Sequence, residues 1–71
     1  MDKAVLQDHL AQAERHVSEG QEHVARQQEL VATLERDGHD TVTARALLAQ
    51  FEELQAMHVA ERDRLLRELS E

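Results

Sequence analysis

The sequence predicts an all-α protein: an antiparallel two-helix hairpin that dimerises into a four-helix bundle, a coiled-coil-like rod. Three observations support this prediction. The 71 residues contain no proline, one turn-forming segment lies near the midpoint, and each half carries apolar residues at helical spacing. We therefore interpret residues 1–71 as a single domain, with a helix over 2–36, a turn over 37–40 and a helix over 41–70.

The first predicted helix carries a seam of residues spaced alternately by four and three, which is the a/d pattern of a coiled coil. The seam consists of Leu6, Leu10, Ala13, Val17, Gly20, Val24, Gln27, Val31 and Leu34. Gly20 and Gln27 are its weak positions, and glycine inside a helix costs about 0.5–1 kcal/mol relative to alanine. We therefore expect Gly20 to make room for a large neighbour.

The predicted turn follows Arg36, whose cation suits the carbonyl end of a helix. Gly38 can adopt the left-handed conformation that closes a helix. Asp40 or Thr41 can then accept from the free amides of the next helix. A connection of about four residues forces the two helices to lie antiparallel.

The second predicted helix carries an apolar stripe with a different spacing. The stripe consists of Leu47, Phe51, Leu54, His58, Arg62, Leu65 and Leu69, with Leu48, Val59 and Leu66 at its edges. Leu47, His58 and Leu69 are eleven residues apart. This spacing predicts a straighter helix than a strict heptad repeat does.

Self-association is expected because so short a chain has little core. The core of such a domain roughly balances the conformational entropy of folding, about 1.5 kcal/mol per ordered residue. There is no cysteine to add a disulfide or a thiolate metal site. Pairing within one hairpin leaves Val5, Leu30, Leu48, Val59 and Leu66 partly exposed, and a second copy would cover them. A homodimer is therefore expected.

The charge of the chain disfavours two classes of partner. A net charge of −7 repels both a nucleic acid backbone and an anionic membrane surface. The sequence contains no apolar run close to the roughly 20 residues of a membrane span, and the amino-terminal residues lack the features of a signal peptide. We expect a cytoplasmic protein with no nucleic acid partner and no membrane partner.

Several segments together resemble a group of short bacterial proteins with no assigned activity. The segments are residues 35–41 (ERDGHDT), 44–48 (ARALL), 51–52 (FE) and 62–66 (RDRLL). The likeness extends from about His16 to the end of the chain, and it implies a folded bacterial protein but no functional residue. In architecture alone the chain is also similar to the Rop family of plasmid RNA-binding hairpins, whose dimers are four-helix bundles. The acidic charge departs from the basic face that RNA binding requires.

The histidines are the candidate functional residues. His9, His16 and His23 are seven residues apart, beside the seam of the first helix, where we expect each ring to cover the edge of the core. The alternative is a divalent metal site. His16 with Glu19, or Glu19 with His23, lies on one face and offers ligands suited to zinc, given a third ligand from the facing helix.

His58 is the polar residue in the middle of the second stripe. With helix ends at Arg36 and Thr41, facing residue numbers add to about 77, which places His58 opposite Glu19 and Gly20. We therefore expect a hydrogen-bonded core histidine that fits beside Gly20, donates to Glu19 and sets the helix register. The same position makes it a candidate for the third metal ligand.

No catalytic motif is present. The serines are Ser18 and Ser70 and the glycines are Gly20 and Gly38, so the chain has neither a nucleophile elbow nor a phosphate-binding loop. We expect a protein that is not an enzyme and needs no cofactor. The sequence favours a small scaffold or regulator of unidentified protein partners, acting through an acidic outer face. The alternative is a histidine and carboxylate binder of zinc or another divalent cation.

Overall fold

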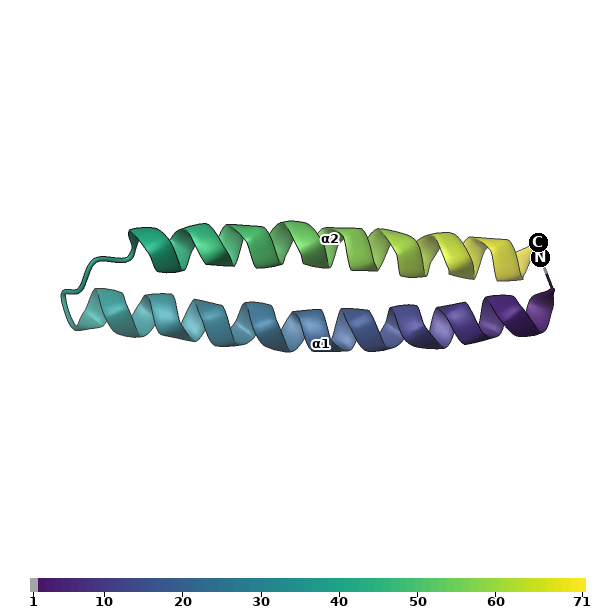
Figure 1. Ribbon diagram of the computed structural model, residues 1–71, viewed down its shortest axis with the longest axis horizontal. Helices are drawn as coiled ribbons and strands as arrows, with labels where there is room; N and C mark the ends of the chain where they lie inside the picture. The colour runs from purple at the N-terminus through teal and green to yellow at the C-terminus, as the bar shows by residue number, and fades with distance from the viewer. Residues whose placement is uncertain (1) are drawn as a thin grey trace.

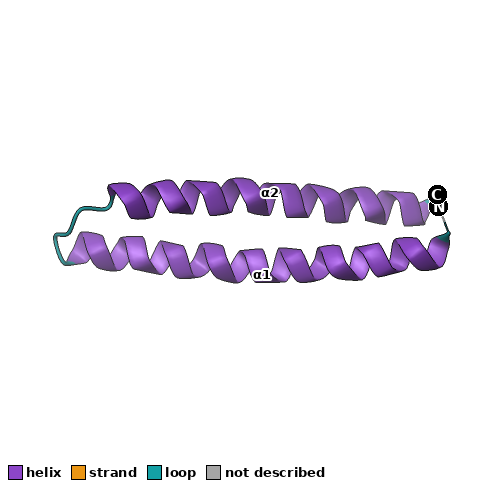
Figure 2. Ribbon diagram, viewed as in Figure 1, coloured by secondary structure: helices purple, strands orange, loops and turns teal. Residues whose placement is uncertain are grey.

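The chain folds into two long antiparallel helices that lie side by side (Figure 1). The computed structural model describes residues 2–71, so Met1 of the expected domain lies outside the described residues. Helix α1 spans Lys3–Arg36 and helix α2 spans Val42–Ser70. Within residues 2–71 there is no strand, and the loops are the connection and the chain ends (Figure 2). The prediction of an all-α helical hairpin is confirmed.

The hairpin is a rod of 53 by 14 by 14 Å. Its length follows from the rise of about 1.5 Å per residue in helices of 34 and 29 residues. The first described residue and the last lie at the same end of the rod, opposite the turn (Figure 1). In the described part of the chain, neither helix has a stretch that is long and apolar enough to cross a bilayer.

The turn is built around Gly38, which has a positive φ of 75°. The Gly38 amide donates to the Glu35 carbonyl at 3.1 Å, and the His39 amide donates to the Leu34 carbonyl at 2.9 Å. These two bonds form a Schellman motif, which satisfies carbonyls at the end of α1 that have no partner within the helix. The expected left-handed glycine is therefore present.

Both helices begin one residue later than expected, α1 at Lys3 and α2 at Val42. Thr41 is the N-cap residue, but its side chain makes no capping bond and instead accepts from Arg45 Nε at 2.9 Å. The Asp40 carboxylate accepts from the Val42 amide at 2.9 Å, and so satisfies one free donor of the first turn. An ion pair between Glu35 and Arg45 joins the two helices beside the turn.

Replacing Gly38 by valine should destabilise the hairpin by about 1–2 kcal/mol, because a branched Cβ is unfavourable in the left-handed region. No heavy atom lies within 4 Å of the position that a Cβ would occupy, so the effect should be purely conformational. Thermal unfolding followed by circular dichroism measures it. Gly38→Asn is the matched control, because asparagine tolerates this conformation, and it should lose much less. Equal melting temperatures for the two variants would contradict this explanation of the turn.

The predicted seam of α1 is confirmed. All nine of its residues are buried or half-buried, while the rest of the described helix is exposed. The buried members are Leu6, Ala13, Gln27 and Val31. A single heptad seam along 34 residues means that α1 presents one narrow line of side chains to α2.

The predicted stripe of α2 is wrong at two positions. Leu47 and Leu54 remain 40% and 49% exposed, and Ala44 and Gln55 lie on the side facing α1 instead. The residues along this contact line are Ala44, Leu48, Phe51, Gln55, His58, Arg62, Leu65 and Leu69. Their spacing is a strict alternation of four and three, so α2 follows the same heptad as α1 and not an eleven-residue repeat.

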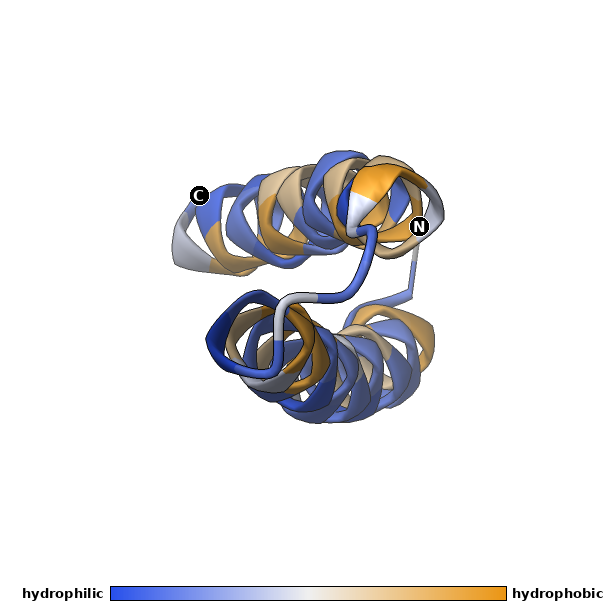
Figure 3. Cartoon of the chain, turned by 90° about the vertical axis from the view of Figure 1, so that its left-hand side faces the viewer, coloured by the Kyte–Doolittle hydropathy of each residue, from blue (hydrophilic) through white to orange (hydrophobic). Residues whose placement is uncertain are grey.

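The core of the rod is thin. Leu6, Ala13 and Leu65 form a buried cluster near the open end, and Leu10 and Leu69 pack against it. Nearer the turn, Val31 is the other buried apolar residue among those described. Viewed along the rod, apolar segments of both helices also lie away from the partner helix (Figure 3). The fold therefore leaves apolar surface outside the hairpin core.

Candidate functional site

One flank of the rod gathers the histidines predicted from the sequence. In the heptad of each seam, the a positions are residues 10, 17, 24 and 31 of α1 and residues 48, 55, 62 and 69 of α2. The residues directly before these positions lie on the same flank of the rod. We call this flank the histidine face. Its residues are His9, His16, His23 and Leu30 from α1, and Leu47, Leu54, Glu61 and Glu68 from α2.

Two of these histidines lie against rings of α2. The His16 and His58 rings have centroids 5.2 Å apart and are tilted by 46°. The His23 and Phe51 rings are stacked with centroids 5.7 Å apart. His16 and His23 therefore lie against the edge of the seam, as expected, but both residues are exposed and not half-buried. His9 is exposed as well.

A groove of about 250 Å³ lies between these two ring pairs. Its lining includes His16, Glu19 and His23 from α1, and Leu54 and His58 from α2. All four residues considered as metal ligands therefore line one groove. No group of three His, Cys, Asp or Glu side chains within residues 2–71 is arranged to hold a metal ion. Across the helices, the His16 and His58 rings lie with their centroids 5.2 Å apart.

The predicted hydrogen-bond partner of His58, Glu19, is wrong. His58 is half-buried, but it makes no hydrogen bond to Glu19 or to any other described residue, and its ring lies against His16 instead. The reason is the register. The numbers of residues in contact add to 74 for both ring pairs, below the expected 77. Helix α1 extends beyond the start of α2 at the turn, because the connection runs back along the rod (Figure 1).

Gln55 is the important residue that sequence reasoning missed. Its Nε2 donates to the Val17 carbonyl of α1 at 2.8 Å. Gln27 makes the reciprocal contact, because its Nε2 donates to the Ala44 carbonyl of α2 at 2.9 Å. The two hydrogen bonds favour a single register between the helices, because sliding one helix along the other would break both bonds. A heptad continued from Ala44 would have placed Gln55 in the seam.

Gly20 makes room for Gln55 more than for His58. A Cβ at Gly20 would overlap Gln55 Oε1 and lie 2.9 Å from its Cδ, but 3.5 Å from His58 Cδ2. Gln55 Oε1 is buried and has no hydrogen-bond partner among the described residues. The expectation that Gly20 leaves space for a large neighbour is confirmed, but the neighbour is Gln55 and not His58.

The carboxylates at the open end of the histidine face are held by one arginine. Arg64 donates to both oxygens of Glu61, at 3.0 and 2.6 Å, and to Glu68 Oε1 at 2.5 Å. The hydrogen bond from Arg64 lowers the pKa of Glu61 below its ordinary value of 4.5, with a smaller contribution from the charge of His9. The same contact raises the pKa of Arg64. Glu61 is therefore an anion throughout the physiological range.

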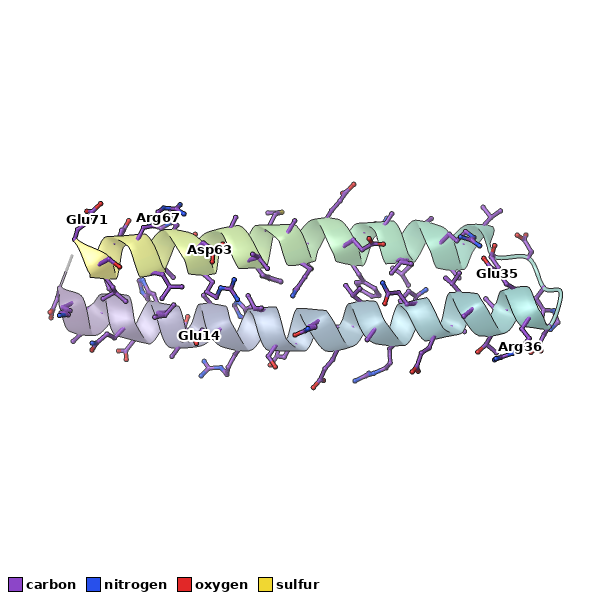
Figure 4. All side chains as sticks on the ribbon, turned by 180° about the vertical axis from the view of Figure 1, so that it is seen from behind. Glu14, Glu35, Arg36, Asp63, Arg67 and Glu71 are labelled. Atoms are coloured by element: carbon purple, nitrogen blue, oxygen red, sulfur yellow. The ribbon has the colours of Figure 1, made fainter. Side chains whose placement is uncertain are left out.

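The Arg64 contact should appear in an acid titration. Because the pKa of Glu61 is lower in the folded protein than in the unfolded chain, the contact stabilises the fold fully above pH 4.5. That stabilisation is lost as the pH falls through the lowered value. Carboxyl NMR should show Glu61 titrating below 4.5 in the parent protein and closer to 4.5 in Arg64→Gln. The control is Arg67→Gln, which alters an outward-pointing arginine (Figure 4). An unchanged Glu61 titration in Arg64→Gln would contradict this cause.

Comparison with known proteins adds no relative. No protein-family model, no curated protein and no solved structure matches this chain. The resemblance to short bacterial hairpin proteins therefore stays a prediction, and the function has to be argued from the geometry of the hairpin itself.

Proposed function

We propose that this chain is a non-enzymatic interaction module, a small scaffold or regulator that works as a homodimer. The single hairpin is half of the functional unit, and a second copy completes a four-helix bundle. The outer surface of that bundle then meets other proteins. The cytoplasmic location expected from the sequence stays a prediction.

The observation that carries this proposal is apolar surface outside the core. Among the described residues, seven large hydrophobic side chains are exposed and only four hydrophobic residues are buried. The accessible surface is 5265 Å². A compact monomer of 8.1 kDa exposes about 4,500 Å². The excess is similar to the roughly 800 Å² that each partner buries in a stable interface.

The outer surface supports the second part of the proposal. Exposed carboxylates without an ion pair within residues 2–71 include Asp8, Glu14, Glu29, Glu52 and Glu53. Negative surface of this kind attracts a positively charged protein surface and speeds its encounter, with a strong dependence on salt. We therefore propose a partner with a basic contact surface. Affinity capture from a native lysate at low and at high salt identifies it.

Light scattering after size exclusion tests the dimer. The expected mass is twice the 8.1 kDa of the chain, with a midpoint of thermal unfolding that rises with protein concentration. A monodisperse, fully helical monomer at micromolar concentration would show that the proposal is wrong.

The histidine groove favours a second candidate function, the binding of a divalent cation. The His16–His58 contact brings two imidazoles together across the helices, and the Glu19 and Gln55 side chains line the same groove. Imidazole and carboxylate suit zinc, cobalt or nickel. Calorimetric titration with these ions should give heat for the parent protein and none for the double variant His16→Ala, His58→Ala. His39→Ala, which alters a histidine outside the groove, is the control.

A further inference from the structure

We propose that two copies pair through the histidine face, and that they do so with their turns at the same end of the bundle. This inference rests on the proposed homodimer and adds the surface and the orientation. Three observations support it: the distribution of exposed apolar side chains, the level of each residue along the rod, and the complementary hydrogen-bonding groups at the open end.

The exposed apolar side chains are unequally divided between the two flanks. Heptad positions place five of the seven on the flank of the histidine face and two, Val42 and Leu66, on the other. The five are Val5, Leu30, Leu47, Leu54 and Met57. On the opposite flank, α1 contributes only polar residues at the position next to its seam: Gln7, Glu14, Gln21, Gln28 and Glu35. The histidine face is therefore the flank that gains more from being covered.

The histidine face changes character along the rod. Leu30, Leu47 and Leu54 make its half nearer the turn apolar. His9, His16, Glu61 and Glu68 make its half nearer the open end polar. Leu30 and Leu47 lie about 4.5 Å apart along the rod, as do His16 and Glu61, because their numbers add to 77 and those of the ring pairs to 74. This offset of three residues is less than one helical turn of about 5.4 Å.

A two-fold axis parallel to the rod brings the apolar half of one histidine face against the apolar half of the other, and the polar half against the polar half. Such an axis places α1 of one copy opposite α2 of the other while keeping every residue at its own level. Leu30 then meets the second copy's Leu47, His23 meets its Leu54, and His16 and His9 meet its Glu61 and Glu68. Imidazole donates to a carboxylate, whose oxygens have acceptor capacity left beside the Arg64 contacts.

A two-fold axis across the middle of the rod makes poorer contacts. It places α1 opposite the second copy's α1 in the reverse direction, so Leu30 meets His9 and His16 meets His23. On α2, Leu47 then meets Glu68 and Leu54 meets Glu61, which buries carboxylates against apolar side chains. The orientation with both turns at one end avoids this cost.

Distance measurements between spin labels test the orientation. The chain has no cysteine, so His39→Cys labels only the turn and Ser70→Cys labels only the open end. With both turns at one end, each variant should give a distance under about 30 Å between copies, since neighbouring helices in a bundle are about 8–10 Å apart. A full-length reversed dimer should give distances near the 53 Å rod length for both. A dimer that overlaps only near the turns should give a short distance at His39 and a long one at Ser70. Either of these last two results overturns the proposed orientation.

Two matched substitutions test the surface. Leu54 and Leu66 are 49% and 45% exposed, on opposite flanks of the same helix. Leu54→Glu should raise the dimer dissociation constant at least a hundredfold in sedimentation equilibrium, and Leu66→Glu should change it less than threefold. Dissociation by Leu66→Glu alone, by both or by neither overturns the surface assignment. If circular dichroism shows that Leu54→Glu is unfolded, Leu30→Gln serves as the second variant. It should raise the dimer dissociation constant about tenfold. A parent protein that is monomeric refutes the proposed function itself, whereas a parent dimer with any of these contrary results refutes only this inference.

Discussion

Replacing Leu65 by alanine should lower the free energy of unfolding by about 2–5 kcal/mol. Leu65 is 1% exposed, the most completely buried large side chain among the described residues, and it holds together the cluster with Leu6 and Ala13. Removing its three outer carbons leaves a cavity in a core with few other apolar contacts. Urea unfolding followed by circular dichroism at fixed protein concentration measures the change.

The neighbouring residue supplies the control for this experiment. Leu66 is 45% exposed on the opposite flank from the histidine face, so Leu66→Ala should cost well under 1 kcal/mol. Both variants remove the same atoms from adjacent positions of one helix. Equal losses would show that burial within the hairpin does not determine the stability of this end of the rod.

Replacing Gly20 by leucine should destabilise the hairpin by about 1–3 kcal/mol. The side chain would occupy the space that the Gln55 amide fills, since even a Cβ lies 2.9 Å from Gln55 Cδ. Gln55 would then lose its hydrogen bond to the Val17 carbonyl and leave that part of the seam. Thermal unfolding measures the loss.

A double-mutant cycle identifies Gln55 as the cause. Gly20→Ala gains about 0.5–1 kcal/mol of helix propensity but displaces the flexible end of Gln55, so it should be nearly neutral in the parent protein. In a Gln55→Ala background the space is empty, and Gly20→Ala should stabilise by about 1 kcal/mol. If Gly20→Ala has the same effect in both backgrounds, Gly20 and Gln55 are not coupled.

The candidate site was predictable in its residues but not in its contacts. His16 and His23 were expected on the edge of the seam because residues seven apart share a helix face, and they lie there. The partner of His58 was not predictable, because it depends on the register between the helices. A shift of three residues moves a side chain by about 4.5 Å along the axis, enough to exchange Glu19 for His16.

By itself the sequence determined the helical hairpin, the position of its turn and the seam of α1. The reason is that these features depend on local preferences: a left-handed glycine, a long run without proline, and apolar residues that repeat without a competing neighbour. Only the tertiary structure decided which face of α2 meets α1. Leu47 and Leu54 are more hydrophobic than Ala44 and Gln55, but the latter pair lies in the seam. Gln55 is accommodated because Gly20 leaves space opposite it and the Val17 carbonyl accepts a hydrogen bond from its Nε2, and both of these partners belong to the other helix.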